Sequence, residues 1–152
     1  DNYKDGKYYY NDKELSSEEQ LEHVKTLIET YGLIYVENPF YETDIESYKK
    51  LNTFARHKCL ICINSKIDEY SRQIKERVFN TALLKFSSLI QLRDDVNLFK
   101  DEKINVLSDS NTYADILVGL EIPLVKIYDN SEGNKFTERL KSIERELIEI
   151  KI

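Results

Sequence analysis

The sequence predicts an α/β fold in which parallel strands alternate with helices, and two patterns support this. Five short apolar runs recur along the 152-residue chain, and each is nearly continuous rather than alternating, as expected of strands buried on both faces of a parallel sheet. Successive runs lie roughly twenty residues apart, which is too long for hairpins and suits one helix per gap. The runs are LIYV (33–36), LICI (60–63), ALLKF (82–86), INVL (104–107) and PLVKI (123–127).

Helix start and stop signals flank the first run. Ser16 and Glu19 have the spacing of a capping box, and Gly32 has the position of a left-handed residue that ends a helix. Thr43 lies three residues before Glu46, which predicts a second capping box. A helix is therefore expected on each side of the 33–36 strand.

The later gaps also have helical periodicity. Helices are predicted over 66–79, 89–99, 112–121 and 134–150, and the charged run Arg93-Asp94-Asp95 is expected to be a solvated helix face. The last helix has its apolar residues spaced for one stripe, at Phe136, Leu140, Ile143, Leu147 and Ile150.

Right-handed βα units of this kind form either an open doubly wound sheet or a barrel. No glycine-rich turn follows any strand, which argues against a dinucleotide or P-loop site. In both architectures function lies at the carboxyl ends of the strands. Two lysines in apolar strands, which are costly unless paired, and a carboxylate on a neighbouring strand indicate a site or what remains of one. The strand-end residues are Glu37, Asn64, Lys85, Ser108 and Lys126.

Composition excludes several classes of protein. The net charge of −6, without a basic cluster, argues against nucleic-acid binding. No apolar run reaches the length of a membrane span. Cys59 and Cys62 lack a second Cys/His pair for zinc, so we expect two buried, reduced cysteines and an intracellular, cytoplasmic location. The chain begins at Asp1 and contains no methionine, which suggests a piece of a longer chain or a processed product.

Four segments resemble the C-terminal barrel domain of enolase (phosphopyruvate hydratase), in the same order and over essentially the whole chain. The opening segment KDGKYYYNDKELSSEEQLEHVKTLIETYGLIYVENPF (4–40) is similar to the family segment that ends in Glu-Asp-Pro. The others are NTALLKFSSLIQL (80–92), LVKIY (124–128) and LKSIERELIEI (140–150). The resemblance implies a (β/α) TIM-type barrel, incomplete in this chain, over residues 1–152, with the N-terminal enolase domain absent.

The resemblance also implies a chemistry. Enolases dehydrate 2-phosphoglycerate to phosphoenolpyruvate: three carboxylates hold Mg²⁺, a lysine removes the proton next to the substrate carboxylate, and a glutamate acts as general acid. That proton is barely acidic, so the metal and lysines must stabilise the dianionic intermediate.

The metal ligands match only in part. Glu37 matches the carboxylate ligand of the Glu-Asp-Pro motif, and Asn38 takes the place of the neighbouring aspartate. Asn64 falls where the family has the next Mg²⁺-binding aspartate, and Ser65 falls on the aspartate beside it. The third ligand and the acid glutamate belong to family segments that precede Asp1.

The lysines match better than the substrate loop does. Lys85 matches the proton-abstracting lysine and Lys126 the second active-site lysine. The family's Ser-His-Arg-Ser-Gly loop corresponds to VLSDSNTYADI (106–116), which is shorter and contains neither histidine nor arginine.

These departures predict a degenerate active site. At roughly 4 Å and an effective dielectric near 20, each lost carboxylate removes on the order of 4 kcal/mol of raw attraction for a cation. We therefore expect Glu37, Lys85 and Lys126 to be vestigial, with no cofactor, or Mg²⁺ if activity remains. The three side chains then form either a plain buried ion-pair cluster or a retained anion pocket.

Five strands and the short KYYY segment (7–10) cannot close an eight-stranded barrel, so strand edges stay open. A protein partner or an upstream segment is expected to cover them, and tyrosines concentrated in the first fifty residues are expected to contribute to such an interface. Two functions follow: a non-catalytic structural or interaction module, or an enolase-type lyase or anion-binding protein completed by upstream sequence or another subunit.

Overall fold

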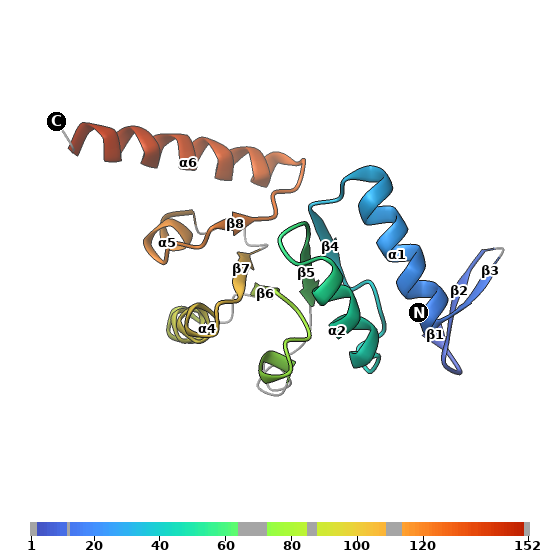
Figure 1. Cartoon of the computed structure of the whole chain (residues 1–152). Coiled ribbons are helices and arrows are strands. Elements are labelled where there is room, and N and C mark those ends of the chain that lie inside the picture. The colour runs from blue at the N-terminus through green and yellow to red at the C-terminus, as the bar shows by residue number, and fades with distance from the viewer. Residues whose placement is uncertain (1–2, 12, 64–72, 85–87, 109–113, 151–152) are drawn as a thin grey trace. The chain divides into compact units, whose positions relative to one another are not determined.

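The computed structural model describes residues 3–11, 13–63, 73–84, 88–108 and 114–150. The chain divides into two compact units, unit 1 over residues 1–82 and unit 2 over residues 83–152. Figure 1 shows the elements of both units with their labels.

The predicted α/β class is confirmed. Five strands form one sheet in sequence order, with parallel pairing and with helices in the connections between them. This is the element order and pairing of an incomplete α/β barrel. The strands are β4 (Tyr35–Glu37), β5 (Leu60–Ile63), β6 (Thr81–Leu84), β7 (Asn105–Ser108) and β8 (Leu124–Val125).

Unit 1 begins with a separate antiparallel sheet of β1 (Tyr3–Lys4), β2 (Lys7–Tyr10) and β3 (Lys13–Ser16). The prediction that the KYYY segment belongs with the barrel strands is wrong. Asp5 and Gly6 both have positive φ, 51° and 80°, which is the geometry of a tight hairpin turn. That turn folds β2 back onto β1 instead of leading it into the parallel sheet.

Helix α1 (Ser17–Tyr31) follows β3, and its predicted ends are confirmed. The Ser16 side chain accepts a hydrogen bond from the Glu19 backbone N–H, and the Glu19 side chain accepts one from the Ser16 N–H. Gly32 ends the helix in the left-handed conformation. The helix lies beside the three-stranded sheet (Figure 1) and buries Leu21, Val24 and Ile28.

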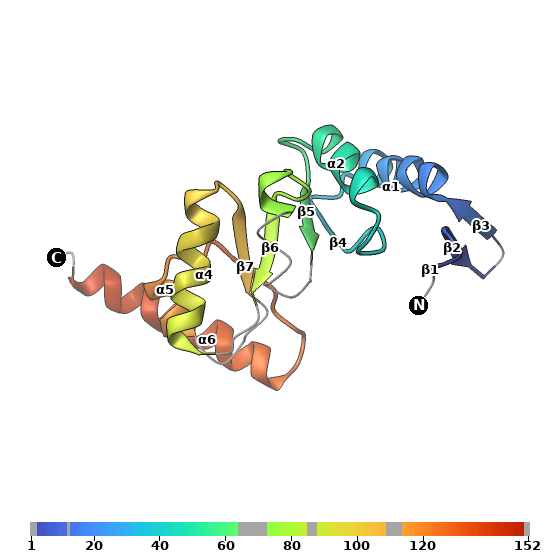
Figure 2. The ribbon, with the colours of Figure 1, turned by 90° about the horizontal axis from the view of Figure 1, so that it is seen from below.

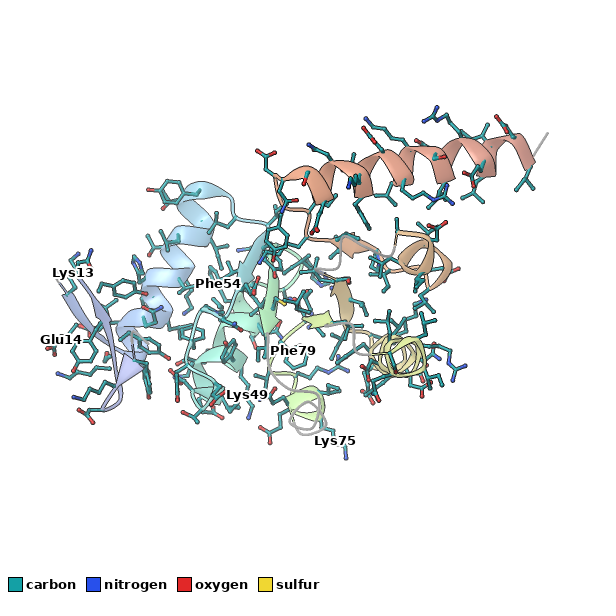
Figure 3. The ribbon with its side chains drawn as sticks, turned by 180° about the vertical axis from the view of Figure 1, so that it is seen from behind. Lys13, Glu14, Lys49, Phe54, Lys75 and Phe79 are labelled. Carbon is teal, nitrogen blue, oxygen red and sulfur yellow. The ribbon has the colours of Figure 1, made fainter. Side chains whose placement is uncertain are left out.

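Helix α2 (Ile45–Phe54) begins one residue later than predicted. Thr43 was expected to cap it, but Asp44 does so, because its carboxylate accepts a hydrogen bond from the Ser47 N–H. After β5, a helical turn is described at residues 73–75 of the predicted 66–79 helix. Lys75 projects outward there, whereas Phe79 is buried (Figure 3).

Unit 2 contains α4 (Leu89–Asp101), which packs along β7 (Figure 2) and is capped by Ser88. The expectation that its charged run is solvated was wrong for Asp95, which is 5% exposed. Asp95 shares a helix face with the buried Leu92 and Phe99. The Gln91 side-chain amide donates to its carboxylate at 2.8 Å.

Two helices complete unit 2: α5 (Ala114–Gly119) and α6 (Ser131–Ile150). The α6 helix begins three residues earlier than predicted, because the Asn130 side chain accepts a hydrogen bond from the Gly133 N–H. Its predicted stripe is buried at Phe136 and Ile143, but Leu147 and Ile150 are 50% and 80% exposed. Arg139 joins α6 to α5 through bonds to Asp115.

The buried Asp95 gives a testable pH dependence. Burial raises the pKa of its carboxyl, although the Gln91 amide lowers it in part. The folded state therefore binds this proton more tightly than the unfolded chain, and stability falls as pH rises from about 4 through the raised pKa. Asp95→Asn keeps an acceptor for Gln91 and should raise the free energy of unfolding at pH 7 by about 1 kcal/mol.

Denaturant unfolding of the natural protein and of Asp95→Asn, measured from below pH 4 to pH 7, tests this predicted difference in the free energy of unfolding. The variant and the natural protein should converge below pH 4, where both side chains are neutral. The exposed Asp94→Asn is the matched control, since it removes the same charge without removing a buried one. Equal effects of the two substitutions at pH 7 would contradict the role given to burial.

Candidate functional site at the strand ends

Glu37 is the last residue of β4 and is half-buried. The Tyr35 hydroxyl donates a hydrogen bond to Glu37 Oε2 at 2.9 Å. The two side chains meet because residues two apart in a strand lie on the same face of the sheet. The carboxylate predicted at this strand end is therefore held by a phenol from its own strand.

The surroundings of Tyr35 keep its hydroxyl protonated. Burial raises the pKa of Tyr35, and the neighbouring Cys62 thiol and Glu37 carboxylate raise it further. Cys62 lies opposite Glu37 in the β4–β5 register and is fully buried. Tyr35 is thus a hydrogen-bond donor to Glu37 over the whole neutral range. Tyr35 is not among the site residues predicted from the sequence, although its two-residue spacing from Glu37 in a predicted strand places both on one face.

Asn38 follows Glu37 in a constrained backbone conformation. Its φ is +47°, in the left-handed region, and its backbone N–H donates to the Cys62 carbonyl at 3.0 Å. Asparagine is among the non-glycine residues that tolerate this region best, but a following proline disfavours it. The main chain therefore turns away from the sheet directly after Glu37, and the Asn38 residue is exposed.

Tyrosine hydroxyls hold the loop that carries the chain from Asn38 to α2. Tyr8 donates to Asp44 Oδ2 at 2.9 Å and accepts a hydrogen bond from the Tyr41 N–H at 3.0 Å. Tyr48, which is buried in α2, donates to the Phe40 carbonyl at 2.9 Å. The loop is thus bonded to β2 on one side and to α2 on the other.

A second series of hydrogen bonds connects β2 to the same loop through Gln20 of α1. The Tyr10 hydroxyl donates to Gln20 Oε1 at 2.8 Å, and Gln20 Nε2 donates to the Pro39 carbonyl at 2.9 Å. Gln20 is buried, so both halves of its amide are satisfied inside the protein. Several of the tyrosines that were expected to contribute to an interface therefore have partners within unit 1.

The strand ends of unit 2 bring together Ser108 and Lys126. Ser108 is the last residue of β7 and is 2% exposed, and its carbonyl accepts a hydrogen bond from the Lys126 N–H at 2.9 Å. Lys126 directly follows β8 and is half-buried. Its Nζ lies 5.7 Å from the centre of the Tyr128 ring, within the range of a cation–π contact.

The remaining predicted positions, Asn64, Ser65 and Lys85, lie outside the described residues. The vestigial roles given to Glu37, Lys85 and Lys126 remain predictions. The choice between an ion-pair cluster and an anion pocket also remains open.

Magnesium is the metal that the resemblance implies, and the described residues do not fit it. Within the described ranges, no three His, Cys, Asp or Glu side chains come close enough to hold a metal ion. At the end of β4 one carboxylate is followed by an amide, and that carboxylate accepts a hydrogen bond from Tyr35. Mg²⁺ prefers anionic oxygen ligands in octahedral geometry, which this pair does not provide.

Both cysteines are buried and neither forms a disulfide in the described part of the chain, as predicted. Burial raises the pKa of the Cys59 thiol, so this side chain is a poor nucleophile. In the described part of the chain, no helix combines the length and apolar character that a bilayer crossing requires.

Comparison with known proteins relates the chain to one family. It is 30% identical to the enolase of Methanosphaera stadtmanae over 82% of the chain. It is 29% identical to the enolase of Methanocaldococcus jannaschii over 95% of the chain, and 26% identical to that of Natronomonas pharaonis over 94%. No family model matches the chain.

These matches confirm the predicted relationship: the chain is related to the enolases. It spans only 34–39% of the length of these three relatives. The activity of the whole enolase is therefore not carried over to this chain by the comparison itself.

The tyrosine bonds around the loop at Asn38–Asp44 can be tested by Tyr8→Phe. The substitution removes a hydrogen bond to the Asp44 carboxylate and leaves the Tyr41 N–H without its acceptor. We expect the free energy of unfolding to fall by about 2 kcal/mol. Thermal or urea unfolding measures the loss. Tyr9→Phe is the control, since Tyr9 lies on the opposite face of β2; an equal loss in this variant would contradict the assigned role of the Tyr8 hydroxyl.

Proposed function

We propose that this enolase-related chain is a catalytically degenerate homologue that serves as a structural or interaction module in a larger assembly. The observation that supports this best is the pair at the end of β4. Asn38 stands where the Glu-Asp-Pro motif has an aspartate, and Glu37 is bonded to Tyr35. A neutral amide and a hydrogen-bonded carboxylate make a weak starting point for a Mg²⁺ centre.

Other positions in the sequence support the same proposal. Asn64 and Ser65 fall on the family's next pair of aspartates, and the 106–116 segment contains neither histidine nor arginine. Compared with the family, the sequence thus has fewer anionic ligands for the metal and fewer cationic side chains for the phosphate. Without a metal, a proton next to a carboxylate stays too weakly acidic for a lysine base such as Lys85 to remove.

An interaction role is supported by the edge of β4. In the described part of unit 1, this strand pairs with β5 on one side and begins the strand order of the parallel sheet. Backbone donors and acceptors on the outer edge of a strand invite pairing with another strand. We propose that a segment of a longer polypeptide, or a second protein, adds a strand there.

The alternative is an enolase-type lyase, or an anion-binding protein, whose missing parts come from upstream sequence or another subunit. The observation in its favour is that both family lysines are kept, as Lys85 and Lys126. It shares the fold with the first proposal and differs from it in chemistry, so one assay separates the two.

The assay is phosphoenolpyruvate formation from 2-phosphoglycerate in millimolar Mg²⁺, followed by ultraviolet absorbance. We expect no turnover above background, because the metal ligands are incomplete. Turnover that is lost in Lys85→Ala and kept in Lys50→Ala, an exposed lysine on α2, would contradict the proposal and establish the alternative. The same assay on the longest natural polypeptide that contains this chain extends the test to a completed barrel.

A further inference from the structure

The carboxylate of Glu37 has a partner that the resemblance to enolase does not account for. The resemblance assigns this carboxylate to Mg²⁺, whereas the structure places the Tyr35 hydroxyl 2.9 Å from Glu37 Oε2. A phenol O–H and a metal ion both neutralise part of the charge of a carboxylate oxygen. They differ in what else they need, since Mg²⁺ requires several further oxygen ligands and the phenol requires none.

The geometry of β4 makes the tyrosine bond a feature of the strand itself. Tyr35 and Glu37 are paired in register with Leu60 and Cys62 of β5, so the backbone of both residues is fixed by the parallel sheet. The Asn38 N–H also bonds to the Cys62 carbonyl, which holds the end of β4 against β5. The bond between the two side chains therefore forms without ordering any loop, and the conformational entropy lost in making it is that of the two side chains.

We propose that the Tyr35 hydroxyl, instead of a divalent cation, is a partner that holds the Glu37 carboxylate at the end of β4. Glu37 is then a hydrogen-bond acceptor that stabilises unit 1, and Mg²⁺ does not bind at this strand end. The inference rests on the proposed loss of the metal centre, but it concerns binding and stability instead of turnover.

A double-mutant cycle tests the tyrosine side of the proposal. The variants are Tyr35→Phe, Glu37→Leu and the two together, with stability measured by urea unfolding of the full chain. A hydrogen bond to a charged group predicts that the two substitutions are coupled by about tenfold in the unfolding equilibrium constant. Tyr9→Phe, combined with the same Glu37→Leu, should show no coupling. Additive effects of Tyr35→Phe and Glu37→Leu would overturn the proposal.

Metal binding tests the other side of the proposal, by comparing the natural chain with Glu37→Leu. Paramagnetic resonance of free Mn²⁺, used as a stand-in for Mg²⁺, reports binding directly. We expect Glu37→Leu to leave the Mn²⁺ titration unchanged, and a chelator to leave the unfolding midpoint of the natural chain unchanged. Mn²⁺ binding that Glu37→Leu abolishes would overturn the proposal even if Tyr35→Phe failed to fold.

The two proposals can fail separately. Turnover of 2-phosphoglycerate contradicts the proposed function whatever the unfolding cycle shows. An absent coupling between Tyr35 and Glu37, in a chain without turnover, contradicts only the tyrosine substitution for the metal.

Discussion

The parallel pairing of β4 with β5 is the constraint on which the candidate site of unit 1 depends. It sets Glu37 opposite Cys62 and leaves the side chains of Tyr35 and Glu37 on one face. The strand ends at Glu37, and the next residue, Asn38, has a left-handed φ. The loop that leads to α2 is anchored directly by Tyr8 of β2 and Tyr48 of α2, and through Gln20 by Tyr10 of β2.

In this region, the contacts that stabilise the fold differ from the groups that the enolase reaction would require. The strand, the turn and the loop contacts depend on backbone pairing and on tyrosine hydroxyls, and these are satisfied without any bound ion. The expected chemistry, in contrast, depends on the number of carboxylates that converge on one point. The contacts that hold the end of β4 and the following loop are therefore distinct from the contacts that a metal centre would need.

The sequence predicted those parts of the fold that local patterns control. Continuous apolar runs gave all five parallel strands to within a few residues, and the Ser16 capping box and Gly32 gave both ends of α1. Predictions from the sequence were wrong or incomplete where tertiary contacts determine the burial or the partner of a side chain. Asp95 looked solvated in a charged run, but its helix face is buried and Gln91 supplies a partner. For the candidate site, the sequence identified Glu37 but not Tyr35, because a tyrosine in a strand is usually explained by packing alone.

The exposed end of α6 has a consequence for how unit 2 loses structure. Phe136 and Ile143 anchor the first part of this helix, while Leu147 and Ile150 stand largely in water. Isolated helical turns are marginal in water, so the last turns depend on the anchored part for their stability. Amide hydrogens should therefore exchange progressively faster towards Ile150, and α6 should melt from its carboxyl end before the packed turns around Phe136 open.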